Sequence, residues 1–224
     1  MIGNQEFWEK QYAKTENNLW GLQPIHTLVE YTSLLESKSK VLDLGMGEGR
    51  NALYFSRRGF VTEGIDISET AVLRAKKYAE ENNLAMKAEV GDVTSFEIKE
   101  NTYSLIILAN VLNFFQEKDI KNIIEKAKKG LMKDGFIYIN VFDRKDPSLE
   151  RNRNNGHQRL NDLTFYRQAT NSYIHYFSKE ELMNYFTGYQ TIKMADSYLL
   201  DINHGEPHYH SIIEMLVKKE ESLI

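Results

Sequence analysis

The stretch Val41-Leu42-Asp43-Leu44-Gly45-Met46-Gly47-Glu48-Gly49-Arg50-Asn51 begins as an apolar strand and ends in a glycine-rich turn. Glycine lets a backbone adopt positive φ and approach a ligand closely. The glycines at 45, 47 and 49 stand directly before residues 51–55, which have the pattern of the first turns of a helix. The N-terminus of such a helix is a binding site for a nucleotide-like ligand. A tight strand-to-helix turn with no ligand is the alternative.

The carboxylate of Asp43 decides which cofactor this turn can hold. In the dinucleotide fingerprint the third glycine comes three positions after the second, whereas Gly49 follows Gly47 by two. Asp43 would also meet a pyrophosphate with like charge. S-adenosylmethionine fits better, because its sulfonium and ammonium are cationic and its ribose hydroxyls can donate to acceptor side chains. The sequence therefore predicts S-adenosylmethionine, and a nicotinamide oxidoreductase is the weaker alternative.

The composition predicts one domain, residues 1–224, that acts on small molecules. A chain of 224 residues is long enough for a single domain with a substantial core. Its formal charge of −4 gives no overall basic footprint for nucleic acid. The chain has no cysteine, which excludes disulfides, thiolate metal sites and a cysteine nucleophile. Covalent C5-methylation of pyrimidines through a thiolate is excluded with them.

The sequence also indicates a cytoplasmic protein that makes no contact with a membrane. Residues 1–8 have neither the basic region nor the apolar region of a secretory signal. The longest largely apolar run, Leu105–Phe115, contains Asn110 and Asn113 and is too short to span a bilayer.

Strand and helix patterns alternate along the middle of the chain. Short apolar runs indicate buried strands, and apolar residues at helical spacing indicate helices. The expected strands are Val41–Gly45, Val61–Ile67, Ala85–Val90, Tyr103–Ala109 and Phe136–Phe142, and the expected helices are Asn51–Arg58, Glu69–Asn82, Asp119–Leu131 and Lys179–Phe186. Five strands joined by crossover helices predict an α/β fold with a Rossmann-like, doubly wound parallel sheet.

The remaining segments depart from this alternation. Residues 1–36 are expected to form an N-terminal helical cap, with a helix over Pro24–Leu35. Tyr189–Leu200 and Ser211–Lys218 have strand patterns on both sides of a polar loop, which predicts a hairpin. Residues 143–176 show little helical or strand period, so we expect a loop region on the substrate side.

Three polar side chains follow the expected strands, at the edge where such sheets bind ligands. Asp66 ends the second strand 17 residues after Gly49, close to the ~20-residue interval at which an acidic residue meets ribose hydroxyls. It could instead cap the next helix, although Ser68 is the better cap candidate. Asp92 follows the third strand, where a carboxylate accepts from an adenine amine while a neighbouring N–H donates to the ring. Asn110 ends the fourth strand and faces the expected reaction centre.

These residues resemble the class I S-adenosylmethionine-dependent methyltransferases. The resemblance rests on the turn Asp43–Gly49, on Asp66, on Gly91-Asp92 and on the turn Leu131-Met132-Lys133-Asp134-Gly135-Phe136. Within that class the chain looks like the tellurite-resistance methyltransferases and their small-molecule relatives. The stretches that carry this similarity are Gly49-Arg50-Asn51, Leu53-Tyr54, Phe177-Ser178-Lys179-Glu180-Glu181-Leu182 and Gly205-Glu206-Pro207-His208.

The resemblance implies methyl transfer to a small-molecule acceptor and a seven-stranded sheet of order 3-2-1-4-5-7-6 with an antiparallel last hairpin. It also implies a set of residues that bind S-adenosylmethionine, namely Asp43, Gly45, Gly47, Gly49, Arg50, Asp66, Ile67, Asp92, Val93 and Asn110. Two positions depart from the tellurite-resistance pattern. Tyr209 stands where an arginine commonly follows the histidine, and Met46 replaces the usual cysteine. The acceptor therefore stays open.

Two residues are candidates for a catalytic role. Methyl transfer from a sulfonium is an in-line displacement, which depends mainly on alignment and exclusion of water. A base is needed only where the acceptor is protonated at the working pH. His208 is the candidate base or acceptor ligand, although a histidine in a hairpin loop is often a structural hydrogen-bonding group. Asn110 is the second candidate, from its position at the end of the fourth strand.

The other histidines offer further possibilities. His157, His175 and His204 lie in segments that could border the pocket. His204, His208 and His210 could bind a metal, because residues two apart on a strand share a face. No nearby carboxylate pattern completes a recognisable site, so no metal is expected.

The aromatic residues near the N-terminus have two interpretations. Trp8, Tyr12 and Trp20 could form a lid over the cofactor, since aromatic faces attract a sulfonium. They could equally anchor the N-terminal segment to the core.

Two alternative functions remain. An RNA methyltransferase is suggested by the basic residues Arg144, Lys145, Arg151, Arg153 and Arg159. Asp143, Asp146 and Glu150 dilute that charge, and no aromatic ladder accompanies it, so nucleic acid is an unlikely partner. A non-catalytic S-adenosylmethionine-binding protein would be expected to have lost the glycines or Asp66, and both are present.

Overall fold

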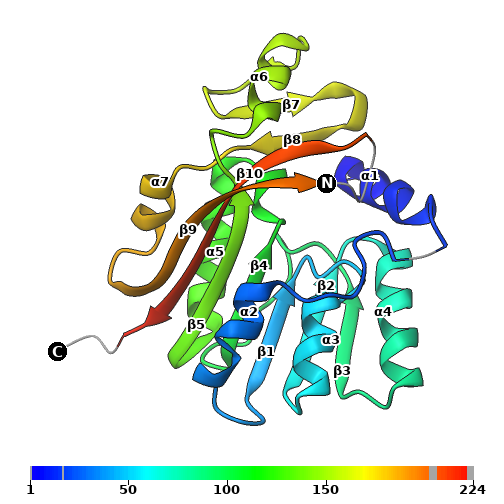
Figure 1. The fold of residues 1–224 in the computed structure, drawn as a ribbon, viewed down its shortest axis with the longest axis vertical. Helices are drawn as coiled ribbons and strands as arrows, with labels where there is room; N and C mark the ends of the chain where they lie inside the picture. The colour runs from blue at the N-terminus through cyan, green and yellow to red at the C-terminus, as the bar shows by residue number, and fades with distance from the viewer. Residues whose placement is uncertain (1, 17, 202–205, 221–224) are drawn as a thin grey trace.

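A mostly parallel seven-stranded sheet forms the centre of the computed structural model, which describes residues 2–16, 18–201 and 206–220 (Figure 1). The strand order is β3-β2-β1-β4-β5-β10-β9, which confirms the predicted order. The strands are β1 (Lys40–Leu44), β2 (Val61–Asp66), β3 (Met86–Val90), β4 (Tyr103–Ala109), β5 (Leu131–Phe142), β9 (Tyr189–Asp201) and β10 (His208–Lys219). β1 pairs in parallel with β2 and β4, and β10 pairs antiparallel with β5 and β9.

Helices cover both faces of the sheet. They are α2 (His26–Glu30), α3 (Arg50–Arg57) and α4 (Glu69–Glu81) on one face, and α5 (Glu117–Gly130) and α7 (Lys179–Tyr185) on the other. The core of the first face joins Leu28 and Phe55 to Val41 and Ile107. The larger core under α5 and α7 contains Leu42, Ile106, Ile124, Ile139 and Leu182. Because β1 and β4 are covered on both sides, nearly all of their residues are buried, as parallel strands require.

The C-terminal hairpin is present and longer than predicted. β10 begins at His208, three positions before the expected start at Ser211, and His208 pairs with Asp201 of β9. The prediction that His208 lies in the hairpin loop is therefore wrong. The error arose because the segment His208-Tyr209-His210 contains no aliphatic residue, and the alternation of apolar and polar residues that marks a strand begins only after it.

Residues 143–176 are not a loop, which corrects the expectation from the sequence. They form α6 (Pro147–Asn154) and a three-stranded antiparallel sheet of β6 (Gln158–Arg159), β7 (Thr164–Arg167) and β8 (Ser172–His175). This unit has its own small core of Leu149, Phe165, Ile174 and Tyr176. Strands of two to four residues are too short to show a period in the sequence. Figure 1 shows the unit beyond the carboxyl ends of the parallel strands, and its role on the substrate side stays a prediction.

The N-terminal region is helical, as predicted, but in shorter pieces. α1 spans Ile2–Ala13, and the helix expected over Pro24–Leu35 is divided into α2 and a 3₁₀ turn at Thr32–Leu34. The hydroxyl of Thr32 donates to the carbonyl oxygen of Leu28 over 2.6 Å. Such a side-chain bond competes with regular helix hydrogen bonds and favours a break.

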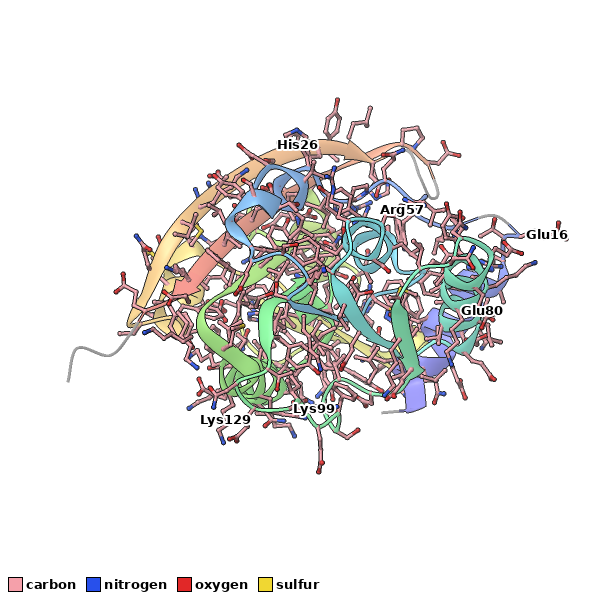
Figure 2. All side chains as sticks on the ribbon, turned by 90° about the horizontal axis from the view of Figure 1, so that it is seen from below. Glu16, His26, Arg57, Glu80, Lys99 and Lys129 are labelled. Carbon is pink, nitrogen blue, oxygen red and sulfur yellow. The ribbon has the colours of Figure 1, made fainter. Side chains whose placement is uncertain are left out.

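Charged side chains gather on the outside of the molecule. Figure 2 shows Arg57, Glu80, Lys99 and Lys129 at its periphery, and each of them is exposed. None of the described helices is long and apolar enough to cross a membrane.

Candidate active site

The glycine-rich turn has the backbone that its sequence predicts. Gly45, Gly47 and Gly49 have φ of +71°, +56° and +79°, a region in which other residues are strained. A Cβ on Gly47 would lie 2.5 Å from the hydroxyl oxygen of Tyr12. The turn is therefore covered by α1, and no side chain fits between the two.

Asp66 connects the end of β2 to this turn. Its carboxylate accepts from the backbone N–H of Gly47 over 2.8 Å and from that of Ser68 over 2.9 Å. Ser68 is the N-cap of α4, since its hydroxyl accepts from the N–H of Ala71. Burial raises the pKa of Asp66 above its ordinary value, although its backbone hydrogen bonds oppose the shift. Asp66 is therefore not needed as the cap, and its carboxylate faces the pocket.

Asp43 is a buried carboxylate whose hydrogen bonds are incomplete. Its Oδ2 atom has no hydrogen-bond partner among the described residues. Burial raises the pKa of Asp43 to about 7, against the opposing effects of Arg50 and of the N–H of Ala52, while Asp66 adds to the rise. A buried acceptor without a donor is costly. A cationic donor bound in the adjacent pocket would satisfy it.

The ends of β3 and β4 complete this side of the pocket. Asp92 Oδ1 accepts from the backbone N–H of Thr94 over 2.8 Å, so the carboxylate is held in a tight turn. Asn110 has a left-handed φ of 55°, and its N–H donates to the carbonyl oxygen of Asn140 over 2.9 Å. All but one of the predicted cofactor residues line the pocket, and they are Asp43, Gly45, Gly47, Arg50, Asp66, Ile67, Asp92, Val93 and Asn110. The exception is Gly49, which is the N-cap of α3.

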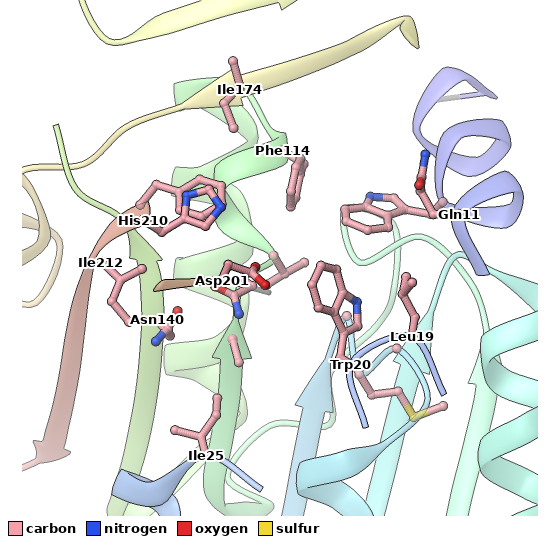
Figure 3. A pocket seen from close by; sticks show the side chains of 18 of the residues that line it. Gln11, Leu19, Trp20, Ile25, Phe114, Asn140, Ile174, Asp201, His210 and Ile212 are labelled. Atoms are coloured by element: carbon pink, nitrogen blue, oxygen red, sulfur yellow. The ribbon is translucent and has the colours of Figure 1, made fainter. Parts of the chain in front are cut away.

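A single cavity of about 980 Å³ joins these residues to the C-terminal hairpin and to the unit at 143–176. It is large for a small-molecule pocket, large enough for a cofactor and a second molecule. Figure 3 shows Trp20, Leu19 and Gln11 on one side of it and His210, Asp201 and Asn140 on the other. The cavity thus has a side near β1 and β2, here called the cofactor side, and a side near β5, β9 and β10, here called the acceptor side.

Comparison with known proteins agrees with this geometry. A family model described as a methyltransferase domain matches residues 41–135. The chain is 29% identical over 135 residues to the probable S-adenosyl-L-methionine-dependent methyltransferase TehB of Haemophilus influenzae. In the sequence of this region and in its fold, the chain is similar to the class I S-adenosylmethionine-dependent methyltransferases. The TehB match covers 60% of this chain and 44% of TehB, so the matched region spans less than half of that relative.

Solved structures share the fold of this chain. The crystal structure of TehB from Haemophilus influenzae superposes with a TM-score of 0.70 at 21% identity, over 95% of this chain and 67% of that one. A 1,6-didemethyltoxoflavin-N1-methyltransferase of Burkholderia thailandensis, solved with 1,6-didemethyltoxoflavin and S-adenosylhomocysteine, gives 0.70 at 14% identity, over 98% and 88% of the two chains. At these identities the likeness concerns the fold alone.

The N-terminal segment is fastened to the cofactor side. Glu48, in the glycine-rich turn, accepts from the backbone N–H of Leu19 over 2.7 Å and pairs with Arg74 of α4 at 2.9 Å. Glu9 of α1 accepts from the hydroxyl of Ser68 over 2.7 Å. Trp8, Tyr12 and Trp20, the predicted aromatic residues, all line the cavity. They are also packed into the fold, as the contact of Trp8 with Phe114 at 4.9 Å between ring centroids shows.

The structure separates the histidines that the sequence brought forward. His208 lines the cavity, whereas His157 and His175 do not. His175 is buried and joins Thr164, 2.7 Å away, to Glu181, 3.0 Å away, which is a structural role. His204 lies outside the described residues.

His210 and its partner Asp146 are the main additions on the acceptor side. His210 Nδ1 lies 2.8 Å from Oδ2 of Asp146, and its ring stacks on Phe142 with centroids 4.8 Å apart. Burial alone would raise the pKa of Asp146, but the hydrogen bonds from His210 and Ser148 outweigh it and hold the pKa below its ordinary value. The sequence assigned Asp146 only to a basic loop, because no spacing rule brings together residues 64 positions apart.

Two more polar residues on the acceptor side have unused hydrogen-bonding atoms. The Oδ1 atom of Asn140 and the Nε and Nη2 atoms of Arg167 are buried without a partner among the described residues, and both side chains line the cavity. Burial lowers the pKa of Arg167 from its ordinary value. The sequence could have identified Asn140 as a site residue, because it is a polar amide inside an otherwise apolar strand. Asn110 was predicted on the same kind of signal, at the end of the fourth strand. Arg167 lies on a strand that the sequence did not reveal.

Proposed function

We propose that this protein transfers a methyl group from S-adenosylmethionine to a small molecule bound on the acceptor side of the cavity. The observation that carries the proposal is the continuity of the cavity, which joins Asp43 and Asp66 to Asn140 and His208 without an intervening wall. One molecule on each side can therefore meet at the end of β4, where Asn110 lies.

The cofactor side supports S-adenosylmethionine over a dinucleotide. The partnerless oxygen of Asp43 suits the ammonium of an amino acid. The oxygens of Asp66 each have remaining acceptor capacity for a ribose hydroxyl, and Asp92 can accept from the adenine amine. Three carboxylates would repel a pyrophosphate, whereas they complement a ligand with two positive charges.

The residues of the chain hold the two ligands and shield them from water, and the bound cofactor would supply an electrophilic methyl group on its sulfonium. The aromatic residues Trp8, Tyr12 and Trp20 keep water from the cofactor side and present ring faces that favour a cation. Asn110 lies where the two ligands meet and positions the reacting groups through its amide. His208 acts on the acceptor side, as base or as ligand.

The acceptor is expected to carry an anionic or hydrogen-bond-accepting group directed at Arg167. A buried guanidinium with two nitrogens that lack a hydrogen-bond partner among the described residues is costly unless an acceptor completes it. A chalcogen oxyanion is the acceptor that the sequence resemblance to the tellurite-resistance methyltransferases suggests. The residue after His208 offers such an anion no positive charge, because it is Tyr209. Its side chain is exposed and stacks on Tyr198, with ring centroids 4.9 Å apart. Arg167 is the better candidate to contact an anion.

The alternative of an RNA methyltransferase is less well supported by the contacts of the basic residues. Lys145 pairs with Asp196 at 3.3 Å, and Arg153 and Arg159 pair with Glu150 and Asp162. Paired cations offer little to a phosphate backbone.

Calorimetry with S-adenosylhomocysteine and NAD, followed by an acceptor screen, tests the proposal. S-adenosylhomocysteine is expected to bind and NAD is not. The screen measures S-adenosylhomocysteine release with chalcogen oxyanions, thiols, phenols, amines and RNA. Binding of NAD alone would overturn the assignment, and release with RNA alone would favour the alternative.

A further inference from the structure

We propose that His208, His210 and Asp201 form a binding site for a divalent transition-metal ion of the zinc class on the acceptor side of the cavity. One oxygen of Asp201 and one nitrogen of each histidine lie within 4.8 Å of one another. The hairpin creates this arrangement, since His208 and His210 share a face of β10 and Asp201 is the partner of His208 in the register with β9. The carboxylate that the sequence lacked near the histidines is thus supplied by the neighbouring strand.

The hydrogen bonds of the two rings point to an ion between them. His208 Nδ1 lies 2.8 Å from the carbonyl oxygen of Glu206, and His210 Nδ1 lies 2.8 Å from the carboxylate of Asp146. Both partners are acceptors, so both Nδ1 atoms must carry a hydrogen. A neutral imidazole has only one. The Nε2 atoms of both rings then present lone pairs to each other at 3.0 Å, a contact that requires a cation between them.

A metal ion fits this position better than a proton does. Two nitrogens that ligate one tetrahedral zinc ion lie roughly 3.3 Å apart, since each Zn–N bond is ~2.05 Å, so the rings need to separate by only a few tenths of an ångström. Asp201 adds the third ligand, and two histidines with one carboxylate are a common set for zinc and related ions. A proton between the rings would join only the two nitrogens, whereas a metal ion can also bind the carboxylate of Asp201.

The surroundings of the two histidines have the features of a second coordination shell. Metal-bound histidines usually donate their other N–H to a carboxylate or a backbone carbonyl. Here the partner of His210 is a carboxylate and that of His208 is a backbone carbonyl. Asp146 is itself fixed, because its side chain is fully buried and it accepts from the backbone N–H groups of Ser148 and Ser211 over 2.8 Å and 2.9 Å. The His210 ring is further held by its stacking on Phe142.

Three protein ligands leave at least one coordination position open, and all three side chains line the cavity. The assignment of a ligand to this open position rests on the proposed function. The position would take the hydroxyl or thiol of the acceptor. Coordination lowers the pKa of such a group. Its O–H or S–H bond breaks, the proton passes to solvent, and the oxygen or sulfur stays bound to the ion as the nucleophile.

The test is a metal titration of the full chain without a histidine tag. Co²⁺ is used as the probe because its visible absorption intensifies in a site of low coordination number, and Zn²⁺ affinity is then measured by competition. We expect about one ion per chain in the wild type. His208→Gln and Asp201→Asn should abolish the Co²⁺ band. Asp146→Asn alters the hydrogen-bond partner of His210 without removing a ligand, and should weaken binding by about 10–100-fold.

His157→Gln is the matched control, because it removes a partly exposed histidine that does not line the cavity. Equal Zn²⁺ affinity in the wild type and in His208→Gln would overturn the site and leave the ring pair bridged by a proton. Asp146→Asn is scored only if its circular dichroism is native, and His208→Gln decides the question otherwise. S-adenosylhomocysteine calorimetry on the same samples separates the two proposals. Cofactor binding without metal binding refutes this site alone, and metal binding without cofactor binding counts against the proposed function alone.

Discussion

The carboxylate of Asp66 accepts a hydrogen bond from the backbone N–H of Gly47, with oxygen and nitrogen 2.8 Å apart. This bond makes the end of β2 and the glycine-rich turn one unit. A ligand that contacts either of them therefore depends on both.

Asp66→Ala is expected to weaken S-adenosylhomocysteine binding by at least tenfold. Two charge-assisted hydrogen bonds to the ribose would be lost, at about 1.5–3 kcal/mol each at most. Calorimetry measures the change. Ser68→Ala is the control. It removes the hydroxyl that caps α4 close to Asp66, and Ser68 itself does not line the cavity. Similar losses in the two variants would show that Asp66 acts only by shaping the turn.

Asp43 gives the cofactor-free protein a specific pH dependence. Its pKa is about 7 in the folded protein against 3.8 as the ordinary value. Between these values the folded state binds more protons than the unfolded state, so the free energy of unfolding falls as pH rises through this window. Asp43→Asn should remove this contribution. The contribution is fully present below about pH 4 and lost above about pH 7, and each pKa unit is worth ~1.4 kcal/mol.

Urea denaturation of cofactor-free samples near the two ends of this window measures the effect of Asp43. The wild type should lose more stability between the two pH values than Asp43→Asn does. Asp92→Asn removes a carboxylate that is not fully buried, in the turn after β3, and serves as the control for a change of charge. An unaltered pH dependence in Asp43→Asn would contradict the burial argument.

Arg167 is expected to bind the acceptor and not the cofactor. Arg167→Met should raise KM for an anionic acceptor by roughly ten- to a hundredfold, the size of a lost hydrogen bond to a charged group, and should leave S-adenosylhomocysteine affinity unchanged. Because two nitrogens of the buried guanidinium lack a hydrogen-bond partner among the described residues, its removal should also raise Tm in the absence of acceptor. Arg159→Met, at an exposed cation that is paired with Asp162, controls for charge. A lower Tm in Arg167→Met would show a structural cation instead.

The N-terminal segment and the unit at 143–176 are expected to gain order when both ligands bind. Both line the cavity and lie outside the central seven-stranded sheet. Hydrogen exchange should slow in α1 and in β6–β8, while α5, which is remote from the cavity, stays constant. Equal protection in the free and bound protein would identify both segments as static structure.

The parts of the fold that the sequence predicted are those in which one local pattern decides the structure. β4 was predicted with its bounds, Tyr103–Ala109, because a parallel strand buried on both faces is an unbroken apolar run. The glycine-rich turn was equally local. The strands of the 143–176 unit are held by contacts across a small core, which no run of two to four residues records.

The candidate site divides in the same way. The predicted cofactor residues follow individual strands, so chain order alone placed Asp43, Asp66 and Asp92 at one edge. The acceptor side depends on register and on long-range contacts. Asp201 meets His208 only because β9 and β10 pair as they do, and His210 meets Asp146 through a turn after β5. Neither contact has a spacing that a sequence would show.

The last prediction concerns His208, which lies on the acceptor side. His208→Ala should lower kcat with any acceptor found in the screen and leave S-adenosylmethionine affinity nearly intact, because the residue is on β10, away from the glycine-rich turn. The loss should be about 10²–10⁴-fold for acceptors whose nucleophilic atom is protonated at neutral pH. This holds whether His208 removes that proton as a base or holds a metal ion that lowers the pKa of the acceptor. It should be smaller for an acceptor that is already deprotonated, such as selenite.

A pair of acceptors that differ in protonation separates this chemical role from a structural one. Both nitrogens of His208 already have partners, Glu206 and His210, so removal of the ring also releases part of the hairpin. A structural defect would lower turnover of both acceptors by the same factor, whereas a role in proton removal lowers one selectively. His157→Ala, at a histidine outside the cavity, should leave both rates unchanged. Equal loss with the two acceptors would therefore make His208 a structural residue, and a parallel loss of cofactor affinity would place it on the wrong side of the cavity.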